Sequence, residues 1–237
     1  VEVVIDGGRP MSKAVDRLEF DQRMLDAAMS SGARYVDGWV ESLDGGVALS
    51  SGSVMEADRV VLASGTNYGL HMRHRIDRPM EFLVGGQYEM DVECDREFVE
   101  LYFTVPDFFA WVIPLHDRAR VGLCVKGNPR PHLEQFIKRL RRDGRVTSER
   151  IHAETFGIIP VHNPSMRTQF GHTVTLGDAA GQVKASTGGG IIFGCVAAKY
   201  ADSPEYERLW RREIGFDLKL HLLIHRFINR LSDKGKD

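Results

Sequence analysis

The sequence is poor in cysteine and has no marked excess of charge of either sign. Its 237 residues include three cysteines, Cys94, Cys124 and Cys195, which lie far apart and lack the spacing of metal ligands. An odd number of cysteines in a chain of this length does not indicate a disulfide framework, so we expect a reducing, cytoplasmic environment. With 31 Lys and Arg against 33 Asp and Glu, the net charge of -2 provides no general attraction to nucleic acid.

Long hydrophobic runs, internal repeats and low-complexity segments are also missing from the sequence. No apolar run approaches the ~20 residues that a transmembrane helix needs. Hydrophobic residues make up 43% and charged residues 27% of the chain, which is typical of globular proteins and excludes a disordered, collagen-like or coiled-coil chain. We therefore expect a cytoplasmic protein without a nucleic-acid partner, for which peripheral contact with a membrane stays open.

The first residues read as part of a longer sequence. The chain begins without Met, and Val1–Ile5 has the β-branched composition of a strand that Asp6-Gly7-Gly8 closes as a turn. We expect the chain to be a fragment.

Hydrophobic periodicity predicts a mixture of helices and strands. An amphipathic helix is expected over residues 16–31, because apolar residues recur there at helical spacing before Gly32. Alternation between Glu81 and Lys126 indicates antiparallel strands with one covered face. In the helix expected after Pro204, the predicted buried stripe comprises Leu220, Leu223, Ile224, Phe227, Ile228 and Leu231. Further strands are predicted at 35–40, 46–49, 59–63 and 173–176, and further helices at 133–140 and 191–198.

The strongest motif is Gly177-Asp178-Ala179-Ala180-Gly181, followed by Thr187-Gly188-Gly189-Gly190-Ile191. A strand that ends in Gly-Asp places a carboxylate at the carboxyl edge of a sheet, where it can accept hydrogen bonds from a polyol such as the ribityl chain of a flavin. Successive glycines allow the backbone to approach a flat ligand, and the helix that follows directs free N–H groups at it. Each half alone fits a plain tight turn equally well, but the two together favour a flavin site.

Aromatic residues mark a second candidate site. Phe109 and Trp111 alternate with Ala110 and Val112, so on a strand the two aromatic side chains share one face. The residue pattern alone favours an ordinary sheet core, although such a face can also wall a cavity for a long ligand that binds mainly by apolar burial.

Other chemistry-bearing residues have plainer interpretations. His71 and His74 have no third ligand nearby, so a solvated loop is favoured over a metal site. The cysteines are interpreted as core residues rather than redox partners. The segment Lys138–Arg142 is interpreted as a solvated helix face rather than a contact for nucleotides or lipid headgroups.

Three further segments carry a family resemblance. Arg17-Leu18-Glu19-Phe20-Asp21 resembles an R-x-x-F-D helix start, Val60–Gly65 resembles an A-D-G segment, and Pro106–Pro114 resembles P-x-x-Y-x-W-x-F-P. Together with the Gly-Asp motif, these segments resemble the geranylgeranyl reductase family, flavoproteins related in fold to the p-hydroxybenzoate hydroxylase group. The resemblance covers nearly the whole chain.

This resemblance implies an α/β (α+β) fold with a partial, Rossmann-like FAD-binding domain. Residues 1–77 and 155–203 would form that discontinuous domain, residues 78–154 an inserted antiparallel-sheet domain for the substrate, and residues 204–237 a C-terminal helical region. The cofactor would be FAD. Its implied contacts are Arg17, backbone near Val40, Asp178, Gly188, Gly189, Gly190 and Ile191, and the implied substrate wall is Phe109, Trp111 and Pro114. No metal site and no catalytic side chain is implied.

The sequence departs from the family pattern in three places. Ser64 stands where the family usually has Asp, which removes a carboxylate. Phe109 and Ile113 replace Tyr and Phe, which keeps the pocket apolar but deletes one hydroxyl. The G-x-G-x-x-G turn that holds a dinucleotide's pyrophosphate is missing from these residues, so they supply only part of a flavin site.

The function implied by the resemblance is reduction of C=C bonds in a geranylgeranyl chain on a lipid, quinone or tetrapyrrole, with NAD(P)H or ferredoxin as the electron donor. One alternative is a flavin-dependent aromatic monooxygenase or halogenase. Another is a non-catalytic truncated flavoprotein or a lipid-binding module.

Overall fold

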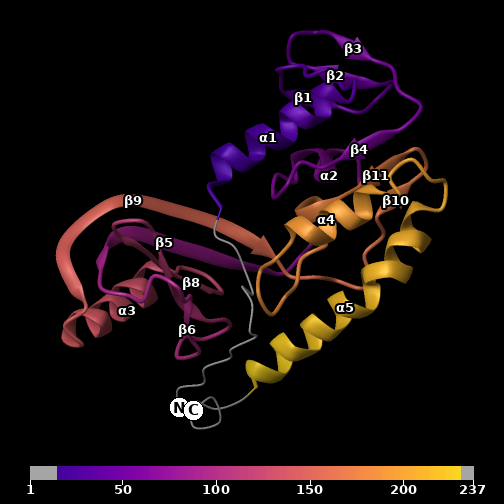
Figure 1. Cartoon of the computed structure of the whole chain (residues 1–237). Helices are drawn as coiled ribbons and strands as arrows, with labels where there is room; N and C mark the ends of the chain where they lie inside the picture. The colour runs from indigo at the N-terminus through magenta and orange to yellow at the C-terminus, as the bar shows by residue number, and fades with distance from the viewer. Residues whose placement is uncertain (1–14, 231–237) are drawn as a thin grey trace. The chain divides into compact units, whose positions relative to one another are not determined.

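The computed structural model describes residues 15–230 and divides the chain into two compact units (Figure 1). One unit comprises residues 1–55 and the other residues 56–237. The strand predicted at Val1–Ile5 and Leu231 of the predicted C-terminal stripe lie outside the described residues.

The N-terminal unit contains one helix and one small sheet. Helix α1 (Arg17–Ser30) begins at Asp16, whose carboxylate accepts hydrogen bonds from the N–H groups of Leu18 and Glu19 at 2.9 and 3.1 Å. The helix is confirmed, but none of its residues is buried. The antiparallel sheet has the order β1-β2-β3 and is formed by β1 (Val40–Ser42), β2 (Val47–Leu49) and β3 (Val54–Met55).

The second unit begins with a small mixed sheet that contains two of the predicted strands, those at 59–63 and 173–176. Strand β4 (Val60–Leu62) runs parallel to β11 (Thr173–Thr175), and β10 (Gln169–Phe170) joins β11 from the other side. Helix α2 (Gly69–Arg73) follows β4, and the 3₁₀ turn η1 (Gly177–Ala180) follows β11. Because parallel strands end at the same edge of a sheet, these two segments lie at one edge, which is where open α/β sheets bind ligands.

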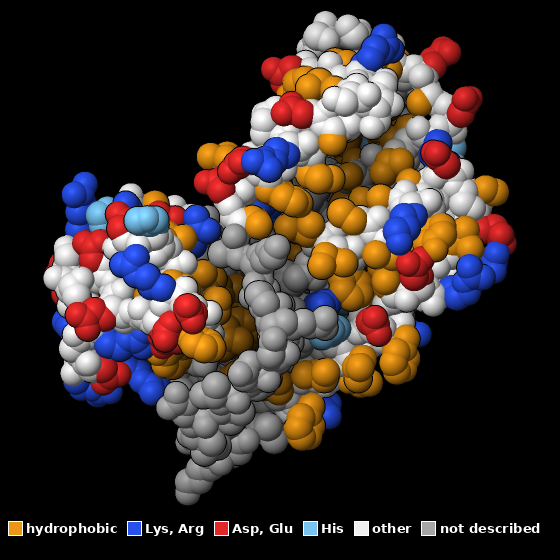
Figure 2. All heavy atoms as spheres, viewed as in Figure 1, with side chains coloured by type: hydrophobic (Ala, Val, Ile, Leu, Met, Phe, Trp, Pro, Cys, Tyr) orange, Lys and Arg blue, Asp and Glu red, His pale blue; other side chains and the backbone are white. Residues whose placement is uncertain are grey.

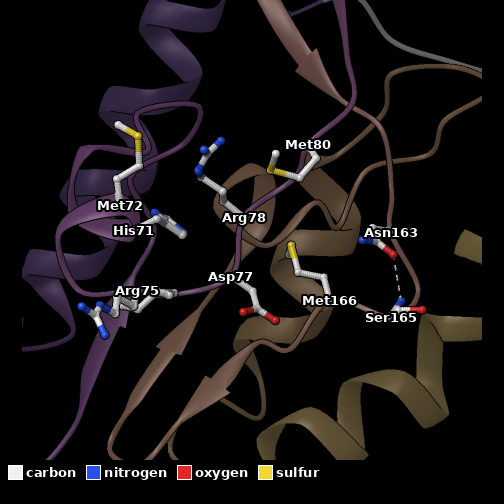
Figure 3. A pocket seen from close by; sticks show the side chains of 10 residues that line it. His71, Met72, Arg75, Asp77, Arg78, Met80, Asn163, Ser165 and Met166 are labelled. Carbon is white, nitrogen blue, oxygen red and sulfur yellow. Dashed lines mark hydrogen bonds between the residues drawn. The ribbon is translucent and has the colours of Figure 1, made fainter.

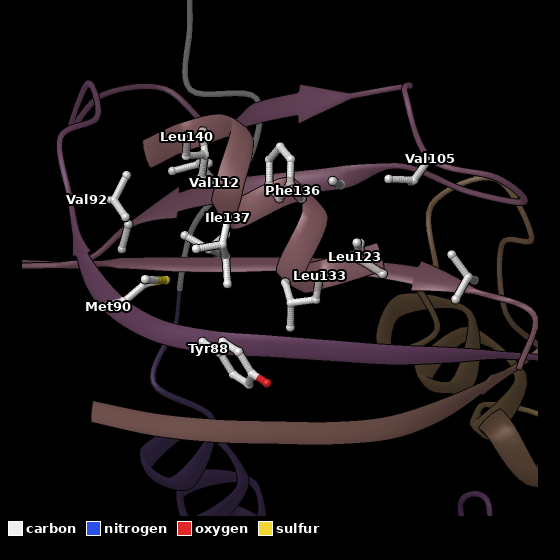
Figure 4. Packing of buried hydrophobic residues seen from close by; sticks show 14 residues of the cluster. Tyr88, Met90, Val92, Val105, Val112, Leu123, Leu133, Phe136, Ile137 and Leu140 are labelled. Atoms are coloured by element: carbon white, nitrogen blue, oxygen red, sulfur yellow. The ribbon is translucent and has the colours of Figure 1, made fainter. Parts of the chain in front are cut away.

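The larger sheet of the second unit is antiparallel, as the alternation predicts. Its order is β6-β7-β8-β5-β9, formed by β6 (Glu100–Tyr102), β7 (Ala110–Pro114), β8 (Ala119–Val125), β5 (Phe82–Val92) and β9 (Val146–Pro160). Helix α3 (Arg130–Arg142) packs its buried residues Leu133, Phe136, Ile137 and Leu140 on one face (Figure 4). The Lys138–Arg142 segment is an exposed helix face apart from Leu140, as predicted.

Strand β9 is absent from the sequence prediction. Most of its residues are exposed, so its side chains lack the apolar alternation that marks a half-buried strand. The strand forms because it pairs with β5 along its whole length. The pairing runs from Val146 opposite Val92 to Pro160 opposite Phe82. The domain boundary predicted between residues 154 and 155 therefore falls inside a single strand of the larger sheet.

The C-terminal helix buries a different face from the predicted one. Helix α4 (Ile191–Ala198) precedes α5 (Tyr206–Ile228), and the two pack together. The buried residues of α5 are Tyr206, Trp210, Ile214, Gly215, Leu218, Leu222 and His225. Leu223 and Phe227 of the predicted stripe are 62% and 64% exposed. The helix carries two apolar stripes, and periodicity does not tell which of them faces the core.

Candidate flavin site

The two halves of the Gly-Asp and glycine-rich motif meet in the structure. A Cβ atom built at Gly190 would lie 2.9 Å from Asp178 Oδ1 and 3.1 Å from Val183 Cγ2. Contacts below 3.0 Å are not tolerated by real Cβ atoms, so glycine at position 190 lets the backbone approach the Asp178 carboxylate. The loop and the turn therefore form one local structure, which the sequence alone left open.

A buried hydrogen-bonded chain fixes the turn that carries Asp178. The N–H of Gly177 donates to Gln182 Oε1 at 2.8 Å, and Gln182 Nε2 donates to the Tyr206 hydroxyl at 3.1 Å. That hydroxyl in turn donates to the Thr175 carbonyl at 2.7 Å. Burial raises the pKa of Tyr206 to about 12, so the phenol stays a neutral donor at physiological pH. These residues anchor η1 to both β11 and α5.

Three further side chains donate hydrogen bonds to backbone carbonyls of the same turn. The Tyr68 hydroxyl donates to the Asp178 carbonyl at 3.1 Å. His71 Nε2 and His162 Nδ1 donate to the carbonyls of Ala179 and Gly181 at 3.1 and 2.8 Å. Burial lowers the pKa of both histidines, which keeps the rings neutral. The solvated loop predicted at His71 is wrong, because this residue lies in helix α2 and is fully buried.

The glycine-rich loop is closed by its own backbone. The Lys184 carbonyl accepts hydrogen bonds from the N–H groups of Thr187 and Gly188 at 3.2 and 2.8 Å, and the Lys184 N–H donates to the Gly189 carbonyl at 3.0 Å. Gly188 has φ +70°, a conformation that side chains rarely adopt. Gly190 is the residue before α4, and no side chain within residues 15–230 caps the helix start. Among these residues the first N–H groups of α4 therefore have no side-chain partner.

The residues of this site fit a flavin. Asp178 offers carboxylate oxygens to hydroxyl groups, and Gly188–Gly190 present backbone without side chains beside it. The helix N-terminus adds a positive dipole end, which favours negative charge on a ligand. Ile191 and Ile192, the first residues of α4, are 46% and 73% exposed, so apolar surface borders the same loop.

The aromatic pair shares a face of the larger sheet, as predicted. The rings of Phe109 and Trp111 lie 6.1 Å apart in an edge-to-face contact. Trp111 lies across Gly122 of β8, where a Cβ atom would come within 2.5 Å of the indole, and its Nε1 donates to Gln87 Oε1 at 3.3 Å. Pro114 alternates with Ile113, so β7 places it on the opposite face from Trp111. The three predicted wall residues therefore do not form a single surface.

The glycine-rich loop contacts the aromatic face directly. A Cβ atom at Gly188 would lie 3.1 Å from Ile159 Cδ1 and 3.8 Å from Phe108 Cζ. Ala185 of the same loop and Leu222 of α5 belong to one buried apolar cluster that includes Leu83, Phe108, Cys124 and Val161 and against which Phe109, Trp111 and Ile159 pack. The two candidate sites found separately in the sequence are therefore adjacent.

A serine–histidine pair beside this loop has no signal in the sequence. Ser186 Oγ and His221 Nδ1 are 2.6 Å apart, which joins the loop to α5. Partial burial lowers the pKa of His221, and the nearby Lys184 ammonium lowers it further.

Cys124 is buried in the core, as the sequence analysis expects of the cysteines. Burial raises the pKa of its thiol to about 12.

Two predicted cofactor contacts belong to the N-terminal unit. Arg17 begins α1 and pairs with Asp21 at 3.1 Å. Val40 begins β1 and pairs with Leu49. Their contact with a cofactor stays a prediction.

Several known proteins are similar to this chain in sequence. No family model matches the sequence. A digeranylgeranylglycerophospholipid reductase of Methanocaldococcus jannaschii is 27% identical over 100% of this chain and 70% of its own length. Reductases of the same name from Methanothermobacter thermautotrophicus and Methanothrix thermoacetophila are 32% and 30% identical, covering 82% and 95% of this chain and 55% and 67% of their own lengths.

Solved structures show the same fold. A geranylgeranyl bacteriochlorophyll reductase-like protein from Thermoplasma acidophilum superposes with a TM-score of 0.72 at 19% identity, covering 94% of this chain and 67% of that one. A flavin-dependent halogenase from Brevundimonas superposes with a TM-score of 0.66 at 16% identity, covering 92% of this chain and 49% of that one.

The mixed α/β fold is that of the geranylgeranyl bacteriochlorophyll reductase-like structure and of the flavin-dependent halogenase. The chain belongs to the geranylgeranyl reductase family, since it is 30% identical to a reductase of which it covers 67%. It spans between about half and 70% of the length of these three relatives.

Proposed function

We propose that this chain forms part of an FAD-dependent enzyme that reduces C=C bonds of a geranylgeranyl chain carried by a lipid. The observation that carries the proposal is the contact of Gly188 with Ile159 and Phe108, because it joins the candidate flavin loop to an apolar, aromatic surface. Two of the relatives described above are named digeranylgeranylglycerophospholipid reductases. The electron donor is NAD(P)H or ferredoxin in this proposal.

The residues of the chain would bind and orient the flavin. Asp178 would accept hydrogen bonds from the ribityl hydroxyls, and Gly188–Gly190 would let the ring system approach the backbone. The uncapped start of α4, at Ile191, would stabilise negative charge on the reduced ring. When bound, reduced FAD supplies a hydride to one alkene carbon while a proton reaches the other.

The apolar face of the larger sheet would hold the isoprenoid chain. Gly85 of β5 lies directly opposite Gly157 of β9, and Gly122 lies on the neighbouring strand β8. The Trp111 indole covers Gly122, but no Cβ rises from Gly85 or Gly157, so the sheet has a low floor at these two positions over which an aliphatic chain could lie. Such a ligand gains ~25 cal/mol per Å² of apolar surface that it buries, and no polar partner is required.

Peripheral membrane contact is the second part of the proposal. Within residues 15–230, no helix is both long enough and apolar enough to cross a bilayer. Helix α5 instead presents an exposed stripe of Phe216, Leu220, Leu223 and Phe227 (Figure 2). Arg212, Lys219 and Arg226 recur at seven-residue spacing along its border and are exposed. An apolar stripe beside basic residues fits the surface of an anionic bilayer, so we place the protein at the cytoplasmic side of a membrane.

The membrane part is tested by sedimentation with vesicles of phosphatidylglycerol or phosphatidylcholine. Leu223→Glu is expected to abolish sedimentation with the anionic vesicles. Phe98→Glu is the control, because Phe98 is 52% exposed and lies outside α5. Equal sedimentation of both variants would exclude α5 as the contact.

The reductase activity is tested with supplied FAD, dithionite and a digeranylgeranyl phospholipid. Mass spectrometry is expected to show a gain of two hydrogen atoms for each reduced bond. Product that instead contains oxygen or halogen and forms only in air would favour the monooxygenase or halogenase alternative. Flavin binding without product from any of these substrates would favour a non-catalytic chain.

A further inference from the structure

A half-buried ion pair lies on the sheet face that is proposed to hold the isoprenoid chain. Arg120 Nε donates to Glu89 Oε1 at 2.9 Å, and the two side chains are 31% and 23% exposed. The proposed function gives neither side chain a role. Covering such a pair with hydrocarbon is costly, because the charged groups would lose their remaining hydration. The apolar part of a ligand is therefore expected to end before this pair.

The strand register places the ion pair on the same face as Trp111. Arg120 of β8 lies directly opposite Glu89 of β5, and Trp111 lies opposite Gly122, two residues further along β8. The residues that alternate with them belong to the core under α3, and these are Tyr88, Met90, Ala110, Val112, Ala119 and Val121 (Figure 4). Because side chains alternate between the two faces of a strand, the ion pair and the indole both project away from α3.

The ion pair and the glycine-rich loop lie at opposite ends of this face. The loop meets the face at Ile159, which pairs with Leu83 near the start of β5. Glu89 lies about 20 Å further along the same strand, at ~3.4 Å per residue. A ligand that follows β5 therefore has one end at the candidate flavin loop and the other at the ion pair.

Glu89 uses only one nitrogen of the Arg120 guanidinium. With the residues that the structure describes, the two Nη groups of Arg120 form no hydrogen bond. The next carboxylate on this face, Asp91, has a partner of its own, since it lies 2.8 Å from His152 Nε2. The planar guanidinium thus keeps donors that match the oxygens of a phosphate.

Two other arginines border a hollow but lack this arrangement. Arg75 and Arg78 line an open pocket of about 540 Å³ between the end of α2 and residues 163–166 (Figure 3). Figure 3 shows their side chains extending in opposite directions, so they do not face one ligand. Arg120 differs because a carboxylate holds it in place and its face continues into the low floor at Gly85.

We propose that Arg120 binds the phosphate group of the lipid that carries the isoprenoid chain, and that Glu89 positions the guanidinium for it. This inference rests on the proposed function, because it names the polar end of the same substrate. The phosphate oxygens would accept hydrogen bonds from the Nη groups while Nε stays with Glu89. The chain would then run past Trp111 toward Gly188, so the double bonds farthest from the headgroup come nearest to the candidate flavin loop.

The test compares the binding of geranylgeranyl phosphate and geranylgeraniol to the 237-residue chain by isothermal titration, without flavin and without turnover. The phosphate is expected to bind about ten-fold more tightly, as a charge-assisted hydrogen bond implies. Arg120→Gln should remove this preference and leave the affinity for the alcohol unchanged. Arg139→Gln is the control, because it removes an arginine that faces Asp143 on α3, across the sheet from the proposed site.

Glu89→Gln separates a binding role from a merely structural ion pair. Removing the carboxylate leaves the Arg120 charge uncompensated, so this variant should bind the phosphate more tightly than the wild type does. A structural pair would give no such gain, and the variant decides the test if Arg120→Gln does not fold.

Two results would overturn the proposal and leave the apolar face as the isoprenoid site. One is equal affinity of the wild type for the phosphate and the alcohol, and the other is a phosphate preference that neither Arg120→Gln nor Glu89→Gln changes. Failure of both lipids to bind would contradict the isoprenoid site itself, and with it the proposed function.

Discussion

The side-chain amide of Gln182 donates a hydrogen bond to the Tyr206 hydroxyl at 3.1 Å, and both groups are fully buried. Through this contact, helix α5 supports the turn of Asp178, because the carbonyl oxygen of the same amide accepts the Gly177 N–H at 2.8 Å.

Removing the Tyr206 hydroxyl leaves two buried groups without a partner, the Gln182 amide and the Thr175 carbonyl. Tyr206→Phe is therefore expected to lower the free energy of unfolding by about 1–3 kcal/mol. Urea unfolding followed by circular dichroism measures this change. Tyr35→Phe is the control, since Tyr35 is 60% exposed, and an equal loss in both variants would contradict the role of the buried network.

Adding one methyl group beside Asp178 should disturb the flavin site. The new Cβ of Gly190→Ala would lie 2.9 Å from Asp178 Oδ1, so the carboxylate has to move. We expect weaker FAD binding in a fluorescence titration. Gly215→Ala is the matched control, because Gly215 lies in α5 outside the glycine-rich loop and the new Cβ would have its nearest contact at 3.6 Å. Equal FAD affinity in the two variants would argue against the position of Asp178 in the site.

Asp178→Ala tests the proposed hydrogen bond to the ribityl chain. Loss of a charge-assisted hydrogen bond costs on the order of 1.5–3 kcal/mol, which corresponds to a rise of about 10- to 150-fold in the Kd for FAD. Flavin retained after dialysis is the measurement. Unchanged flavin content, in a variant with the far-ultraviolet spectrum of the wild type, would exclude this role.

The position of Trp111 depends on a glycine across the sheet. The new Cβ of Gly122→Ala would come within 2.5 Å of the indole, so the ring must leave Gly122 and lose its hydrogen bond to Gln87. We expect a shifted tryptophan emission and a stability loss of about 1–3 kcal/mol. Gly157→Ala on the same face meets nothing within 4 Å and should change neither quantity.

Stability should fall as the pH is lowered below about 6.5. Burial lowers the pKa of His162 in the folded chain, while the unfolded chain keeps the ordinary value of 6.5. Between these two values the unfolded state binds more protons, so the free energy of unfolding rises with pH. Melting temperatures between pH 5 and 8 measure the effect. His162→Asn should flatten the profile relative to the exposed control His116→Asn, and parallel profiles would contradict the assignment.

The sequence by itself determined the local parts of this protein. The strands at 60–62 and 173–175 and the helices at 130–142 and 191–198 follow from apolar runs and periodicity. The Gly-Asp and glycine-rich segments were also recognisable, because their chemistry depends on residue types at close spacing.

The tertiary structure alone decided how these parts meet. Gln182 meets Tyr206, and Gly188 meets Ile159, only after chain segments distant in sequence have packed together. The same holds for β9, whose polar residues form a strand because β5 supplies the hydrogen bonds. For α5, apolar residues recur at helical spacing along two stripes, and packing against Val174 and Phe193 buries the one that carries Trp210 and Leu218. Patterns in a sequence report local geometry, whereas burial depends on partners that no local pattern identifies.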